Sequence, residues 1–106
     1  MIDEHLTLRQ IQVQVDNWVQ ENGDYFKPLS IMAQISEESG ELAMILNNLY
    51  GDRVKKMEDS NKKIGEEICD LIFALVCLAN SHNIDIDKLW KEKISARCKR
   101  DENRYK

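Results

Sequence analysis

The sequence predicts an all-α chain of four to five helices whose helical bundle is completed by oligomerisation. Apolar residues recur at helical spacing in separate segments, and residues that start and stop helices flank these segments. No stretch alternates apolar and polar residues as a strand would. The 106 residues suffice for one domain, expected over 1–106, but a domain of this size buries only a modest core.

The first two helices are expected at residues 4–22 and from Pro28 to Tyr50. In the first, apolar side chains recur every three or four positions, and Asn22-Gly23 is a typical C-terminal stop. Pro28 suits the first turn of a helix because its φ is already helical and its missing N–H is not needed there.

Two further helices follow a polar stretch. Residues 52–63 are rich in charge and turn formers, which indicates a solvated loop or a frayed helix start. The third helix is expected from Ile64 and is apolar on nearly every side after Asp70, which implies burial against several neighbours. A chain this short supplies few neighbours, so we expect a homodimer or homotetramer. Asn83 and Asp85 are cap-like residues before a fourth helix of about four turns.

Charge and cysteine content exclude some classes of function. The 19 acidic residues outnumber the 15 lysines and arginines, and a net charge of −4 argues against binding a nucleic acid polymer. Cys69, Cys77 and Cys98 show no CxxC spacing and are expected to be reduced, inert thiols. The first ten residues lack an apolar signal core, and the longest apolar run is too short to span a bilayer. We therefore expect a cytoplasmic protein without a membrane partner.

Two pairs of acidic residues stand out. Glu38 and Glu41 in the second helix are three residues apart, which is about 4.5 Å along the helix axis. They lie on the same face, so both can bind one ion. Glu67 and Asp70 repeat this spacing in the third helix. Clustered carboxylates repel one another and need protons or a cation. Oxygen ligands without His or Cys favour Mg²⁺ or Mn²⁺ over zinc.

A solvated surface is the alternative interpretation of these acids, because such pairs are common in charged helices. Glu21 and Asp24 have the same spacing, and spacing alone favours the solvated interpretation. Two features favour a site instead. Glu38 falls in register with the apolar series that includes Ile35, and Asp70 interrupts an apolar run.

The acidic pattern resembles a known family. Glu37-Glu38-x-x-Glu41 and Glu67-x-x-Asp70 resemble the EExxE and ExxD signature of the MazG-like nucleotide pyrophosphohydrolases. Further segments are similar to the short, single-domain YpjD-type branch of that family: Tyr25 to Leu29, Gly40 to Ala43, Asn47 with Tyr50-Gly51, Glu66 to Asp70, Cys77 to Asn80 and Arg100-Asp101. The resemblance covers most of the chain.

The resemblance implies an all-α NTP pyrophosphatase fold. It also implies hydrolysis of a nucleoside triphosphate, a dNTP or a non-standard NTP, to a nucleoside monophosphate and pyrophosphate. Carried over by motif, Glu38, Glu41, Glu67 and Asp70 would be Mg²⁺ ligands, with Mn²⁺ as a substitute. Glu37, together with Glu38, would position the attacking water or accept its proton. Such a reaction needs charge neutralisation and an in-line water more than covalent help.

Substrate contacts are expected from two groups of residues. The resemblance implies that Lys93 and Arg97 in the fourth helix contact phosphate or nucleotide, although bases near a helix C-terminus are often simply solvated. Asn47 and Asn48 are candidates for hydrogen bonds to a base or sugar. The neighbouring aromatics Tyr25 and Phe26 could stack on a base, with packing between the first two helices as the alternative.

Two other functions compete with this hypothesis. A di-iron or di-manganese carboxylate bundle also pairs acids on helices, but it typically needs Glu-x-x-His motifs, which this sequence lacks. A non-catalytic helical oligomer or adaptor would carry the acids on a solvated groove and use the basic tail 97–106 to bind an acidic partner. For an enzyme, house-cleaning of damaged nucleotides and control of an ordinary nucleotide pool stay open alternatives.

Overall fold

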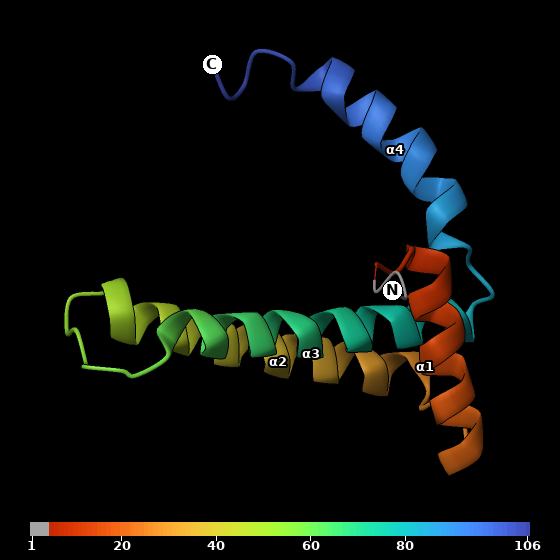
Figure 1. Cartoon of the computed structure of the whole chain (residues 1–106), viewed down its shortest axis with the longest axis horizontal. Coiled ribbons are helices and arrows are strands. Elements are labelled where there is room, and N and C mark those ends of the chain that lie inside the picture. Colours follow the sequence, from red (N-terminus) through yellow and green to blue (C-terminus); the bar gives the residue numbers. More distant parts are fainter. Residues whose placement is uncertain (1–4) are drawn as a thin grey trace.

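A computed structural model describes residues 5–106 and confirms the all-α class. The described part contains four helices and no strand: α1 (Leu8–Asn22), α2 (Pro28–Tyr50), α3 (Ser60–Ser81) and α4 (Ile86–Arg100). The helices α2 and α3 run antiparallel as a long hairpin, α1 crosses its end, and α4 leads away from it (Figure 1).

The core lies where α1, α2 and α3 meet. Its buried residues come from all three helices and are Val15, Val19, Ile31, Ile35, Ala74, Val76 and Cys77. Ile31 is only 1% exposed, so the N-terminal half of α2 is fixed firmly against its neighbours. Burial of these apolar faces, more than helix propensity, stabilises helices of this length.

The ends of α1 are set by local chemistry. Thr7 Oγ1 accepts a hydrogen bond from Gln10 N at 3.1 Å, and Gln10 Oε1 accepts one from Thr7 N at 2.8 Å. This capping box starts the helix at Leu8, later than the expected 4–22; residue 4 itself lies outside the described residues. Gly23, at φ 137°, ends the helix in a conformation that side-chain-bearing residues rarely adopt.

The other helix boundaries follow the sequence closely. The second helix begins at Pro28 and ends at Tyr50, as predicted. The third begins at Ser60, so the last residues of the polar stretch 52–63 are helical rather than loop. Asp85 caps α4 by accepting a hydrogen bond from Lys88 N at 3.3 Å.

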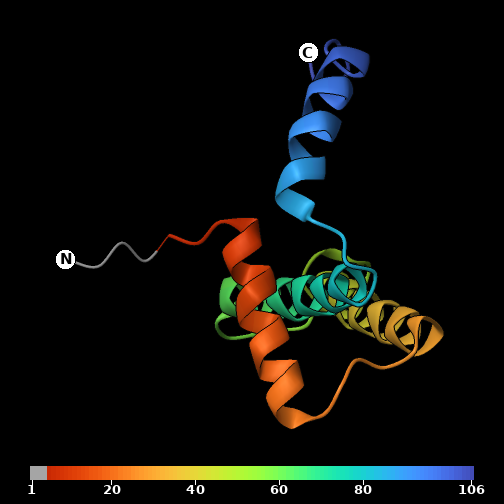
Figure 2. The same cartoon turned by 90° about the vertical axis from the view of Figure 1, so that its right-hand side faces the viewer.

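The single chain leaves its bundle open. No residue of α4 is buried, and Trp90 is 55% exposed. Figure 2 shows α4 standing away from the other three helices. On α3, Ile68, Ile72 and Leu75 also keep more than two fifths of their surface exposed. The sequence predicts that α3 is buried against several neighbours, but within one chain only part of its apolar surface is buried.

The cysteines do not form disulfides in the described structure. Cys77 is buried, and this burial raises the pKa of its thiol, so it stays protonated. Cys69 and Cys98 are exposed on α3 and α4. Over residues 5–106, no helix combines the length and apolar character needed to cross a membrane.

Candidate active site

Three of the predicted acids meet between α2 and α3. Carboxylate oxygens of Glu38, Glu67 and Asp70 all lie within 4.8 Å of one another. The antiparallel hairpin brings the middle of α2 beside the first half of α3, so acids from two distant segments share one site (Figure 1). Glu41 is near enough for its charge to act on Glu67. The four predicted ligands therefore form one carboxylate cluster.

Two oxygens of the carboxylate cluster are buried without a partner. Glu38 Oε2 and Glu67 Oε2 are both inaccessible to solvent, and neither makes a hydrogen bond. Burial of the charged form is the largest cause that raises the pKa of Glu67 to about 7, followed by the close approach of Glu38 and the charge of Glu41. Unpartnered buried carboxylate oxygens are costly unless something compensates them.

A divalent cation fits this donor set. No lysine or arginine within residues 5–106 forms an ion pair with any of the four acids, so the protein itself does not neutralise them. Glu66, next to Glu67, is instead exposed and lies 4.0 Å from Lys62. Carboxylate oxygens alone are typical ligands of Mg²⁺ and Mn²⁺. Glu38, Glu41, Glu67 and Asp70 are the residues that would hold such an ion.

Glu37 lies outside the buried part of the carboxylate cluster. It is exposed on α2, and successive helix positions point about 100° apart, so it faces away from the direction of Glu38. Its exposed carboxylate is in contact with solvent. Its predicted role as the group that positions water or accepts a proton stays a prediction.

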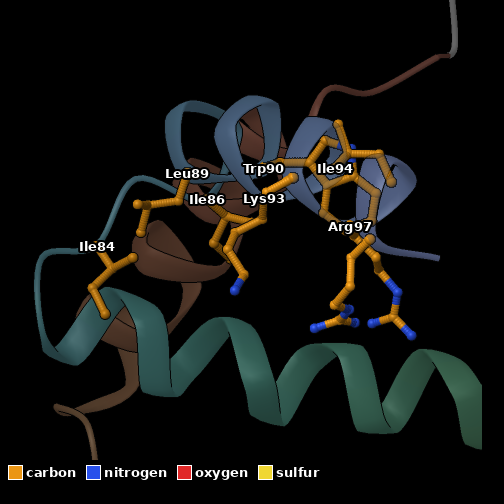
Figure 3. Close-up of a pocket in the computed structure, with 9 residues that line it drawn as sticks. Ile84, Ile86, Leu89, Trp90, Lys93, Ile94 and Arg97 are labelled. Carbon is orange, nitrogen blue, oxygen red and sulfur yellow. The ribbon is translucent and has the colours of Figure 1, made fainter. Parts of the chain in front are cut away.

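The predicted phosphate contacts Lys93 and Arg97 lie on α4. They line an apolar groove of about 650 Å³ together with Leu89, Trp90 and Ile94. Figure 3 shows both side chains directed from α4 across a gap toward α3. Arg97 Nε also lies 3.5 Å from Asp101, at the C-terminal end of the same helix.

An aromatic cavity lies beside the carboxylate cluster. It has a volume of about 270 Å³ and is lined by Trp18, Val19, Asn22, Asp24, Tyr25, Phe26, Ile31, Gln34, Phe73 and Cys77. Gln34 is one turn before Glu38 on α2, and Phe73 is about 4.5 Å along α3 from Asp70. The cavity and the carboxylate cluster therefore share the same face of the hairpin.

The two aromatic candidates differ in their surroundings. Tyr25 packs against the core and donates a hydrogen bond to Asp16 Oδ1 at 2.6 Å. Burial and this hydrogen bond raise the pKa of Tyr25 to about 12, so its hydroxyl keeps its proton. Phe26 is 69% exposed at the cavity. Trp18 and Phe73 meet edge to face, with ring centroids 5.8 Å apart.

Asn47 and Asn48 lie on the other side of the carboxylate cluster. They are about 14 Å further along α2 than Glu38. Their carbonyl oxygens accept hydrogen bonds from Gly51 N and Lys55 N, which close the C-terminal end of the helix. Along the hairpin, Asn47 and Asn48 are therefore separated from the aromatic cavity by the carboxylate cluster.

Three residues of this region were not predicted from the sequence. Gln34, Trp18 and Phe73 were not expected to line a cavity next to the carboxylates. The spacing of Gln34 from Glu38 and of Phe73 from Asp70 indicates a shared helix face, but Trp18 lies on α1 and has no such signal.

An all-α hairpin that gathers acids from both helices into one partly buried cluster defines a helical enzyme with a carboxylate site. Residues 26–102 match the family model for the MazG nucleotide pyrophosphohydrolase domain. The chain therefore belongs to the MazG nucleotide pyrophosphohydrolase family, as its motifs indicate, and is an enzyme of the nucleoside triphosphate pyrophosphohydrolase class. This assignment favours catalysis over the adaptor alternative.

Similar proteins support the assignment over nearly the whole chain. YpjD of Bacillus subtilis (strain 168), described as uncharacterised, is 40% identical over 100 residues, which are 93% of this chain and 90% of YpjD. The crystal structure of YpjD from Bacillus subtilis has a TM-score of 0.72 at 39% identity, covering 87% of this chain and 93% of that one. A Bacillus-conserved MazG protein, described as a nucleotide pyrophosphohydrolase, has a TM-score of 0.74 at 34% identity, covering 89% and 92%.

Proposed function

We propose that this protein hydrolyses a dNTP or a non-standard NTP to a nucleoside monophosphate and pyrophosphate, with Mg²⁺ as cofactor and Mn²⁺ as a substitute. One observation carries the cation requirement. Three carboxylates lie within 4.8 Å of one another, and two of their oxygens are buried without a partner. Such a cluster is suited to a divalent ion that also meets phosphate oxygens.

In this proposal some acidic residues bind the cation and others act on the attacking water. When bound, the cation supplies positive charge that offsets the charge of the phosphates. The acids of the cluster hold it, and Glu37 or Glu38 positions the attacking water and accepts its proton. The water oxygen forms a bond to one of the two phosphorus atoms of the α–β bridge, and the bond from that phosphorus to the bridging oxygen breaks. The bridging oxygen leaves with the other phosphorus, which gives pyrophosphate and the monophosphate.

We place the base in the aromatic cavity. The cavity lies on the same face of the hairpin as the carboxylate cluster, about one helical turn away. This separation matches the short distance between the phosphates and the base within one nucleotide. Phe26 offers an exposed ring for stacking, whereas the hydroxyl of Tyr25 is held by Asp16. Asn47 and Asn48 would serve a nucleotide that extends the other way along α2.

The phosphate contacts and the oligomer are linked in this proposal. Lys93 and Arg97 point toward α3 without contacting the four acids, and the groove that they line is apolar. A homodimer or homotetramer that covers this groove and the exposed face of α3 would bury Trp90, Ile94 and their neighbours. We expect the same contact to exclude water from the space between Lys93, Arg97 and the carboxylate cluster, where the phosphates would bind.

A direct assay tests the proposed function. The purified protein is incubated with standard and modified (d)NTPs, with and without Mg²⁺, and the products are separated by ion-exchange chromatography. We expect monophosphate and pyrophosphate only with the cation present. Absence of turnover across a broad panel, or equal turnover after chelation of the cation, contradicts the proposal.

A further inference from the structure

A polar pair, Gln12 and Asn80, joins α1 to the turn between α3 and α4. Gln12 is 1% exposed, and among the described residues it is the single buried polar side chain. Its Nε2 donates to Asn80 Oδ1 at 2.9 Å and to Ile84 O at 2.7 Å. Its Oε1 accepts from Ile86 N at 2.9 Å, and Asn80 Nδ2 donates back to Gln12 O at 2.9 Å. Both N–H groups of the Gln12 side-chain amide and its oxygen are thus hydrogen-bonded.

The residues that Gln12 binds, Ile84 and Ile86, lie at the N-terminal end of α4, which we call the root of the helix. Ile84 and Ile86 lie on either side of the N-cap Asp85, so Gln12 fixes the backbone where the helix begins. A second tie comes from Asp87, whose Oδ2 accepts a hydrogen bond from Arg9 N at 3.1 Å. Beyond this root, no residue of α4 is buried. Within one chain, the direction of α4 is therefore set at its first turn.

A small change at the root becomes a large one further along the helix. Arg97 is eleven residues beyond Ile86, which is about 16 Å at 1.5 Å per residue. A tilt of about 10° at the root would move Arg97 by about 3 Å and Lys93 by about 2 Å. Displacements of this size are enough to lose a hydrogen bond to a phosphate.

We propose that Gln12 and Asn80 are positioning residues that set the direction of α4 and, through it, the distance of Lys93 and Arg97 from α3. The inference rests on the proposed function, in which the side chains of Lys93 and Arg97 contact the phosphates. Glutamine suits the position because its amide both donates and accepts. A glutamate would keep the acceptor and lose the donors, and a methionine would fill the space without either.

The direction of α4 can be measured with the native cysteines. Cys69 on α3 and Cys98 on α4 are exposed and Cys77 is buried, so nitroxide labels report the α3–α4 distance by pulsed electron resonance. Dilution with unlabelled protein restricts the signal to pairs within one chain. We expect one narrow distribution in the wild type, and a shift or broadening of about 3 Å in Gln12→Met. Gln14→Met, an exposed change on the same helix, is the matched control and should leave the distance unchanged.

Kinetics then separate positioning from simple loss of structure. For Gln12→Met we expect KM for the nucleotide to rise about tenfold with kcat within about twofold, because the carboxylate cluster is untouched and mainly binding is lost. An unchanged distance distribution in Gln12→Met, or a changed one with unchanged KM, overturns the inference.

A milder variant keeps the inference testable if Gln12→Met does not fold. Asn80→Asp retains the acceptor for Gln12 Nε2 and loses the donor to Gln12 O. It should change the distance and KM in the same direction by a smaller amount, and no change in either refutes the inference. A wild type without turnover refutes the proposed function, whereas the distance measurement still decides whether the pair sets α4.

Discussion

Replacing Glu67 by glutamine should abolish the effect of Mg²⁺ on stability and the part of the pH dependence that Glu67 causes. The carboxyl of Glu67 has an ordinary pKa of 4.5, and its pKa is about 7 in the folded chain without a cation. Between these values the folded chain keeps a proton that the unfolded chain has released. The free energy of unfolding of the cation-free protein should therefore fall as pH rises from about 4.5 to 7.

Mg²⁺ should restore what the rise in pH removes, because the ion replaces the proton in the carboxylate cluster. At pH 8 and a cation concentration of 100 Kd, binding to the folded state alone adds about 2.7 kcal/mol. For a domain of this size that corresponds to a rise in Tm of roughly 10–20 °C. Glu67→Gln should lose this rise, yet match or exceed the wild-type Tm at pH 8 without the ion.

Thermal unfolding followed by circular dichroism, at one fixed protein concentration, measures both effects. Glu66→Gln is the matched control, because it removes the same charge from the adjacent, exposed position. It should keep the wild-type dependence on pH and Mg²⁺. The reasoning fails if Glu67→Gln is still stabilised by Mg²⁺ like the wild type, or if Glu66→Gln loses that stabilisation equally.

Three further predictions concern other parts of the molecule. Glu38→Gln and Asp70→Asn should each lower kcat/KM at least about 1,000-fold while far-UV circular dichroism stays near wild type; retained activity would mean that the cation is held elsewhere. Arg97→Ala should raise KM about tenfold with little change in kcat in steady-state assays, and a fall in kcat alone would contradict a ground-state phosphate contact. Ile31→Ala should destabilise by about 2–5 kcal/mol in urea unfolding, because its side chain is almost fully buried; a loss below about 1 kcal/mol would argue against this core.

Boundaries set by local chemistry could be predicted from the sequence. Pro28 starts α2 and Asp85 caps α4 as expected, because both act on their own first turn. The start of α3 was placed four residues too late, at Ile64 rather than Ser60. Residues 60–63 are all polar, so apolar periodicity could not mark the start of the helix there.

The carboxylate cluster was predictable because two local patterns coincide. Each helix places its acids on one face, and an antiparallel hairpin then brings these faces together. The aromatic cavity needed knowledge of how α1 crosses α3, which no local pattern gives. The Gln12–Asn80 pair is harder still to predict, since the two residues are 68 positions apart and a hydrogen bond between two helices leaves no periodic pattern in the sequence.

The direction of α4 was also beyond the sequence. Its side chains Leu89, Trp90 and Ile94 predict an apolar contact, but they do not say whether that contact lies in the same chain or in another copy. Within one chain none of these residues is buried, and α4 stands away from the other three helices (Figure 2). In the proposed oligomer another copy buries this face, so its burial would belong to the assembly rather than to the folded monomer.

Phosphorus NMR of the reaction products tests the central claim most directly. A dNTP is incubated with Mg²⁺ and either wild-type protein or Glu38→Gln, and the phosphate resonances are followed with time. We predict deoxynucleoside monophosphate and pyrophosphate from the wild type, and at least about 1,000-fold slower release from Glu38→Gln. Release of diphosphate and inorganic phosphate, or an undiminished rate in the variant, would contradict cleavage of the α–β bridge at this carboxylate cluster.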